Sequence, residues 1–211
     1  MPGSLTLLAL FALPALTQQA NWTGPYQPCL NSAELKKTGH MRIGVRYDIS
    51  DRFVTQQFHQ AFDFWSRLLD AEFYDEQSPS CAIAVVEGSK ALLKETNVVA
   101  RAQFPDRPKF HGWVAVDSKA SAYLSDSEAV AIWIHEIGHL LGLRHNPSAA
   151  SLMFYIVYAT NELDSADLRA LASLHSFRPI PAIQYSTVDD YGPAKKSTPV
   201  RLYPNEPLPG K

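Results

Sequence analysis

The stretch that most constrains this chain is residues 135–145, HEIGHLLGLRH. His135 and His139 are four residues apart, so a helix places both imidazoles on one face, where they can bind one metal ion. Glu136 follows His135 directly and therefore points about 100° away around the helix. Its carboxylate would lie beside the metal rather than on it, as the general base of a hydrolytic reaction requires.

Gly142 is the expected end of that helix, because glycine adopts the left-handed conformation that terminates helices at little cost. The chain can then turn back and present His145 as a third ligand. Three neutral nitrogen ligands and an open position make a catalytic zinc site, whereas four protein ligands close a structural one. A surface helix with two solvated histidines is the alternative, but Gly142 and His145 at the correct spacing favour the metal site.

Residues 135–145 resemble the long zinc signature of the metzincin metallopeptidases, H-E-x-x-H-x-x-G-x-x-H. Met153 stands at a suitable distance for the methionine-containing turn of that group, which would form a hydrophobic floor under the imidazoles. The variable positions are most similar to the matrixin branch: Leu140, Leu141, Leu143 and Ser148. The resemblance extends loosely over residues 41–177 and is specific at the zinc helix and the Met turn.

The resemblance implies an α+β, metzincin-like catalytic domain with a twisted mixed β-sheet, a backing helix, a central zinc-binding helix and a C-terminal helix. It implies a secreted zinc-dependent endopeptidase that hydrolyses peptide bonds of a protein or peptide substrate. His135, His139 and His145 would bind one catalytic Zn²⁺. Glu136 would be the general base that takes a proton from the zinc-activated water.

Tyr155 lies two residues after Met153, where matrixins usually have proline. In the astacin and serralysin branches, a tyrosine at that place sits near the zinc and can stabilise the developing oxyanion. We therefore predict that Tyr155 is a catalytic residue whose phenol hydrogen-bonds the tetrahedral intermediate. The alternative is that Tyr155 only lines an apolar specificity pocket.

Hydrophobic periodicity predicts the elements around the zinc helix. Residues 43–47 alternate as a half-buried strand, and residues 55–69 carry the apolar stripe of an amphipathic helix. The near-continuous apolar run 81–86 is typical of a strand covered on both faces. Residues 97–104 are expected to be an edge strand, along which the resemblance implies that an extended substrate adds. Residues 112–117 are the last strand before the zinc helix.

Two cap signals and one possible second metal site complete the domain. Ser125 and Glu128 form a capping box at the start of the zinc helix, and Asp164 is a good N-cap for a final helix that ends near residue 177. Matrixins often carry calcium sites and an extra structural zinc. His111 and Asp117 are the candidates here, but without the usual spacing, and we expect His111 to be a partly exposed strand-end residue.

The N-terminal region predicts secretion. Residues 1–20 contain an apolar run and read as a signal peptide, although no Lys or Arg precedes the run. Secretion to the extracellular space would make Asn21 a glycosylation acceptor and would favour a disulfide between Cys29 and Cys81. The signature Pro-Arg-Cys-Gly, with which the propeptide of a matrixin commonly inhibits the enzyme through its cysteine, is absent from the sequence. The alternative to the disulfide is that Cys29 binds the zinc and inhibits the enzyme.

The sequence divides into a catalytic domain, residues 21–177, and a proline-rich tail, residues 178–211, in which we expect no chemistry. A net charge of −2 without basic runs argues against nucleic acid as a partner. No stretch reaches the roughly 18 apolar residues of a membrane span, so we expect no membrane association. We expect a monomer.

Two alternatives concern the site itself. Glu162 could replace His145 as the third zinc ligand, as a carboxylate does in gluzincin peptidases. A secreted zinc-binding protein of the same fold without turnover is the rival function, and a purely structural secreted domain is a third. Glu136 argues against the rival function, because loss of that base is the expected route to such a protein.

Overall fold

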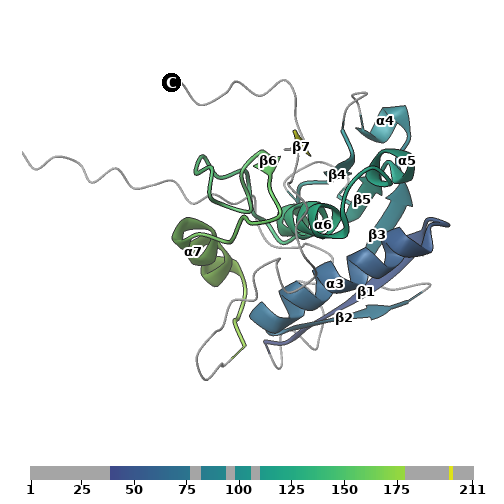
Figure 1. The fold of residues 1–211 in the computed structure, drawn as a ribbon. Helices are drawn as coiled ribbons and strands as arrows, with labels where there is room; N and C mark the ends of the chain where they lie inside the picture. Colours follow the sequence, from purple (N-terminus) through teal and green to yellow (C-terminus); the bar gives the residue numbers. More distant parts are fainter. Residues whose placement is uncertain (1–38, 77–81, 94–97, 106–109, 179–199, 202–211) are drawn as a thin grey trace, which may run out of the picture.

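The computed structural model describes residues 39–76, 82–93, 98–105, 110–178 and 200–201, and this part of the chain is α+β (Figure 1). Its centre is a mixed sheet with the strand order β2-β1-β3-β5-β4. Four strands run parallel, whereas β4 pairs antiparallel with β5 and forms one edge. The strands are β1 Met41–Asp48, β2 Ala71–Asp75, β3 Ala82–Glu87, β4 Ala100–Ala102 and β5 Trp113–Val116. The predicted mixed sheet is therefore confirmed.

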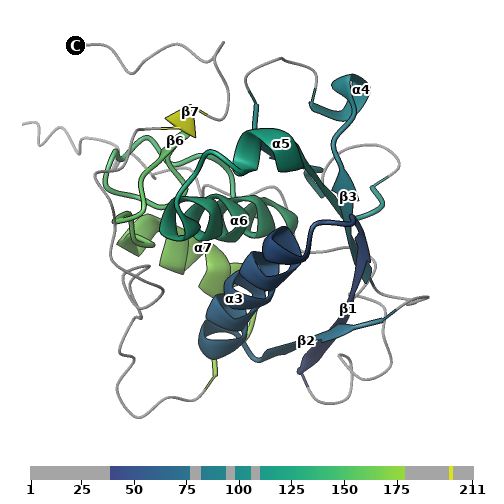
Figure 2. The same ribbon diagram turned by 45° about the vertical axis from the view of Figure 1, so that its right-hand side comes forward.

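Strand β3, in the middle of the sheet, is less buried than its apolar sequence suggests. Val45 of β1 is buried, as the alternation predicts. In β3, Ile83 and Val85 are buried, but Ala84 and Val86 are only half-buried. The expectation that this apolar run is covered on both faces is wrong, because both long helices lie on the same side of the sheet (Figure 2).

The backing helix α3, Arg52–Leu68, begins before the predicted residue 55. Asp51 caps it by accepting hydrogen bonds from backbone N–H groups of the first turn. The Nε1 of Trp65 donates to the carbonyl oxygen of Ile134 at 3.1 Å, so α3 is bonded to the zinc helix as well as packed against it. The apolar stripe is buried as predicted: Val54, Phe58, Ala61, Phe62, Trp65 and Leu68.

Several short elements were not predicted. β2 pairs with β1 at the second edge of the sheet, and its sequence AEFYD mixes polar and apolar residues. The short helices α4, Lys90–Leu93, and α5, Ser118–Ser121, flank the β4 and β5 strands. The predicted edge strand over residues 97–104 is shorter in the structure, but its place at the sheet edge is confirmed.

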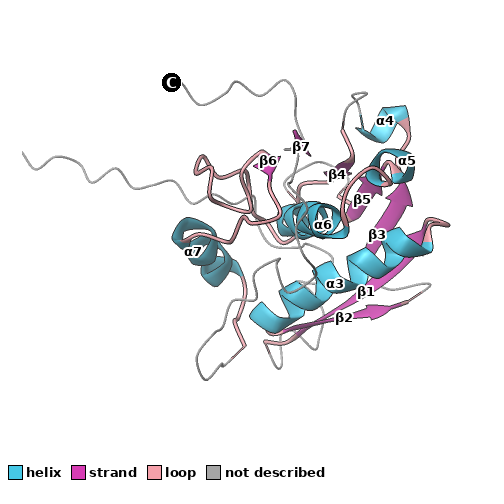
Figure 3. Ribbon diagram, in the orientation of Figure 1, coloured by secondary structure: helices cyan, strands magenta, loops and turns pink. Residues whose placement is uncertain are grey.

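The chain after the sheet carries the remaining elements (Figure 3). They are α6 Asp126–Leu140, β6 Ile156–Val157, α7 Ser165–Leu174 and β7 Val200–Arg201. Asp164 caps α7 as predicted, and the helix ends before residue 177. β7 belongs to the proline-rich tail and pairs antiparallel with β6.

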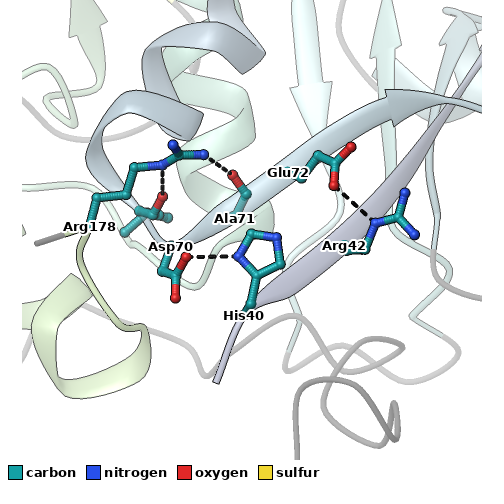
Figure 4. Close-up of polar contacts among 7 residues, drawn as sticks. His40, Arg42, Asp70, Ala71, Glu72 and Arg178 are labelled. Carbon is teal, nitrogen blue, oxygen red and sulfur yellow. Dashed lines mark hydrogen bonds and ion pairs between the residues drawn. The ribbon is translucent and has the colours of Figure 1, made fainter. Parts of the chain in front are cut away.

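His40 and Arg178, from the two ends of the domain, both contact the segment that joins α3 to β2 (Figure 4). The Nδ1 of His40 lies 2.7 Å from a carboxylate oxygen of Asp70, in the turn between α3 and β2. The guanidinium of Arg178 donates to the carbonyl oxygens of Leu69 and Ala71, each at 3.2 Å. Arg178, which the sequence assigned to the tail, therefore anchors the end of the domain to the sheet.

Several predictions lie outside the described residues. They are the signal peptide, the glycosylation acceptor Asn21, both cysteines, and most of the tail. Within the described ranges, no helix is long and apolar enough to cross a membrane.

Candidate active site

The zinc helix α6 is buried almost all round. It starts with the predicted capping box: the Ser125 hydroxyl accepts from the Glu128 N–H, and the Glu128 carboxylate accepts from the Ser125 N–H. Ile132, Trp133 and Ile137 are among its fully buried side chains. A helix held on all sides keeps the groups that it carries in fixed positions.

The imidazoles on α6 are oriented by backbone carbonyls. The Nδ1 of His135 lies 2.7 Å from the Leu152 carbonyl oxygen, and the Nδ1 of His139 lies 2.8 Å from that of Leu143. Because a carbonyl only accepts, both Nδ1 atoms must carry hydrogen, which leaves each Nε2 with its lone pair available. The Nε2 of His139 lies 3.2 Å from the Nε2 of His145.

The three histidines fit a zinc ion. Their ligand atoms lie within 4.8 Å of one another, and no other such cluster occurs among the described residues. Tetrahedral zinc with Zn–N bonds of about 2.0–2.1 Å requires nitrogens roughly 3.3 Å apart, close to the His139–His145 distance. The Nε2 of His135 is buried, and no described residue forms a hydrogen bond with it. Burial and His145 lower the pKa of His135 to about 3, so it is a neutral ligand.

Gly142 makes the turn that the sequence predicts. Its φ is +104°, in the region that favours glycine. The Gly142 N–H donates to the His139 carbonyl at 3.1 Å, and the Leu143 N–H donates to the Gly138 carbonyl at 2.9 Å. These bonds close the helix and return the chain so that His145 faces the other two imidazoles.

Glu136 is fully buried beside the histidines. One carboxylate oxygen accepts a hydrogen bond from the backbone N–H of Ala102 on the edge strand β4. The other oxygen, Oε1, has no hydrogen-bond partner among the described residues. Burial raises the pKa of Glu136 to about 8, opposed by the Ala102 N–H and the charge of Arg101. A buried carboxylate with one oxygen held and one free is suited to proton transfer.

The turn containing Met153 packs directly under the zinc helix. Met153 is fully buried, and a Cβ placed on Gly138 would lie 2.7 Å from its sulfur. Only glycine at position 138 therefore allows this close approach without a shift of Met153. The Asn146 N–H donates to the Met153 carbonyl at 2.8 Å, which joins the residue after His145 to the same turn.

Asp167 of α7 is a supporting residue that sequence reasoning missed. Its buried carboxylate accepts from the Asn146 side-chain amide at 2.9 Å and from the Ser151 hydroxyl at 2.6 Å. It also accepts from the Asp164 N–H at 3.1 Å and thus completes a capping box. Only the capping spacing was visible in the sequence, because Asn146 and Ser151 are 21 and 16 residues away.

The other sequence candidates lie elsewhere. Tyr155 is buried, with its ring centroid 4.3 Å from that of Phe154. Glu162 is exposed and is outside the histidine cluster, so the alternative in which it replaces His145 is not supported. Asp117 caps α5 by accepting from the Ala120 N–H, and His111 is an exposed residue at the start of β5, as expected.

Comparison with known proteins bears on the family of this chain. Matrix metalloproteinase-A of Caenorhabditis elegans is 27% identical over 124 residues, which make up 55% of this chain and 24% of that protein. The chain thus spans about a quarter of the length of this relative. The Matrixin family model matches residues 41–176, from β1 through α7, and so includes the sheet and the histidine cluster. Because the match takes in more than half of the 211 residues, the chain belongs to the matrixin family of zinc metallopeptidases.

Proposed function

We propose that this protein is a secreted zinc-dependent endopeptidase that hydrolyses proteins or peptides. The observation that carries the proposal is the convergence of three histidine nitrogens beside a buried glutamate with an open oxygen. His135, His139 and His145 are the proposed ligands, and Glu136 is the proposed general base. Secretion, directed by residues 1–20, accords with the generally extracellular matrixins.

The proposed reaction divides between the metal and the chain. Bound zinc would polarise the scissile carbonyl and make the attacking water more acidic. Glu136 takes the proton of the water through Oε1 as the oxygen attacks the carbonyl carbon, and then delivers it to the leaving amine nitrogen. The Ala102 N–H holds the second carboxylate oxygen, so the base keeps its orientation during both transfers.

The edge strand β4 is the proposed substrate track. An extended peptide can add to a free sheet edge through main-chain hydrogen bonds. β4 is an edge of the sheet, and its Ala102 N–H points at Glu136. A peptide bonded to β4 would therefore run past the general base, which supports an endopeptidase reaction on extended chains.

Tyr155 is proposed to stabilise the oxyanion. Its place two residues after Met153 and its burial, which would hold the phenol in a fixed position, support this proposal. Tyr155→Phe should lower kcat by roughly 100- to 1000-fold while KM changes little, as for loss of an oxyanion donor. A wild-type kcat in this variant would leave Tyr155 as a pocket residue only.

The deciding experiment measures cleavage of casein by the wild type and by Glu136→Ala at matched zinc content. We expect activity in the wild type only, with zinc retained in both. Glu136→Gln is the matched control for packing, because its amide oxygen can still accept from Ala102. If both proteins hold one zinc and neither cleaves casein, the rival function of zinc binding without turnover replaces the peptidase.

A further inference from the structure

A second site lies at the opposite end of the sheet from the active site. A cavity of about 160 Å³ opens between α3 and the β1–β2 edge. Because one water occupies about 30 Å³ of liquid, the cavity has room for a small side-chain head group. The lining residues that matter here are Tyr47, His59, Phe62, Asp63, Phe73 and Asp75.

The walls of this cavity are aromatic. The ring centroids of Phe62 and Phe73 are 5.0 Å apart, and those of Tyr47 and His59 are 5.3 Å apart. Phe62 is buried, whereas Tyr47 and Phe73 are half-buried and so present part of their rings to the cavity. The faces of aromatic rings attract cations.

The mouth of the cavity carries carboxylates. Asp75 lies 3.4 Å from the Nε2 of His59, with both side chains about half exposed or more, 64% and 49%. Such a long, solvated pair is weak and can exchange partners. Asp75 also acts on Tyr47: burial first, and then the Asp75 charge, raise the pKa of that phenol. Asp63 is already paired with Arg67 at 3.3 Å. Among the described residues, Asp75 is therefore the lining carboxylate whose ion-pair partner is a histidine rather than a lysine or arginine.

The other face of the same strand carries a similar pair of an aromatic ring and a carboxylate, which contacts Arg42 of β1. Side chains alternate along β2, so Glu72 and Tyr74 lie on one face and Phe73 and Asp75 on the other. On the first face, the Arg42 guanidinium lies 2.9 Å from the Glu72 carboxylate and 4.9 Å from the Tyr74 ring centroid. Figure 4 shows the Arg42–Glu72 contact. A carboxylate and an aromatic ring two residues apart therefore already hold a guanidinium on this strand.

From this repetition we propose that the cavity binds the arginine side chain of a partner protein. The planar guanidinium stacks on the aromatic walls and donates to the Asp75 carboxylate. β2 is the sheet edge remote from β4, where Glu136 is held, so binding here is separate from the proposed peptidase reaction.

The test is a titration of the full chain with N-acetyl-arginine amide, followed by amide NMR shifts. We expect saturable shifts at Tyr47, Phe73 and Asp75, and roughly tenfold weaker binding in Asp75→Asn, because a charge-assisted bond is lost. Glu72→Gln is the matched control, since it removes a carboxylate from the other face of β2 and should leave binding unchanged.

Two further probes test whether binding needs the charge and the planar shape of the guanidinium. N-acetyl-citrulline amide has nearly the same shape without the charge and should not bind. N-acetyl-lysine amide should bind more weakly, because an ammonium does not stack. The absence of saturable shifts with the arginine probe, equal binding of citrulline, or equal binding of lysine would each overturn the assignment. Casein cleavage by Asp75→Asn should stay at the wild-type rate. A failure of the arginine-binding proposal would therefore leave the proposed peptidase activity untouched, and the reverse also holds.

Discussion

The two long helices on the same face of the sheet differ in the burial of their polar residues. α3 is amphipathic and keeps His59 and Asp63 on its exposed side. α6 buries His135, Glu136 and His139 completely. A buried polar group costs free energy unless a partner compensates it. The comparison teaches that exposed polar groups on α3 can be solvated by water, whereas the buried ones on α6 need partners supplied by other segments or by a metal.

The largest expected effect is on zinc affinity, and it distinguishes His139 on α6 from His59 on α3. His139→Ala should lower zinc affinity by far more than the roughly 10- to 100-fold typical of a residue that only orients a ligand. His59→Ala, on the exposed side of α3, should leave zinc affinity unchanged. Competition with a chromophoric chelator measures both. Equal zinc affinities in the two variants would contradict the assignment of the site to α6.

The next effect tests the buried Asp167 carboxylate, which supports the segment around the Met153 turn below α6. Asp167→Asn replaces one acceptor oxygen by a donor facing the Asn146 amide, the Ser151 hydroxyl or the Asp164 N–H. We expect the free energy of unfolding to fall by about 1–3 kcal/mol. Urea denaturation measures it.

The control for this variant is Asp164→Asn in the same helix cap. Asparagine caps helices about as well as aspartate, so little change in stability is expected. If both substitutions cost the same, Asp167 acts only as a helix-capping residue and not as the support of the Met turn.

The pH dependence of the free energy of unfolding should report on the burial of His175, which contacts the end of α6. His175 is buried, its Nε2 lies 2.7 Å from the Leu141 carbonyl at the end of α6, and burial lowers its pKa below 6.5. Below pH 6.5 the unfolded chain takes up the proton first, so this contribution to stability is present above that pH and is lost as pH falls toward the folded pKa.

His175→Gln should therefore flatten the fall in unfolding free energy below pH 6.5, by at most about 1.4 kcal/mol per pH unit. Urea denaturation at pH 7.5, 6.5 and 5.5 gives the two slopes. The remaining histidines are common to both proteins and cancel in the comparison. Parallel pH profiles would show that His175 protonates as easily in the folded chain as in the unfolded one.

The smallest effect is expected on the exposed side of α3. Arg67 and Asp63 form an ion pair at 3.3 Å across one helical turn, with both side chains exposed. Arg67→Ala should change the free energy of unfolding by less than about 0.5 kcal/mol. Thermal or urea unfolding measures it. A loss near that of Asp167→Asn would break the contrast between the two helices.

Local signals predicted the helices α3, α6 and α7 but missed the short helices α4 and α5 and the edge strand β2. Ser125 and Asp164 each lie next to the helix that they cap, so the starts of α6 and α7 could be read from the sequence. The Asp51 cap was not recognised, and the start of α3 was placed at residue 55 instead of residue 52. β2 was missed because AEFYD lies at a sheet edge, where burial imposes no clear pattern. β3 looked doubly covered, since an apolar run does not tell which face a helix occupies.

The sequence by itself determined which three histidines converge in the structure. The four-residue spacing of His135 and His139 and the glycine at position 142 are enough to bring three imidazoles together, because helix geometry is local. The tertiary structure decided the orientation of these side chains. The Leu152 carbonyl fixes the tautomer of His135, and the Ala102 N–H holds Glu136 from 34 residues away. Contacts at such separations depend on how the sheet and the turns pack, which no local pattern encodes.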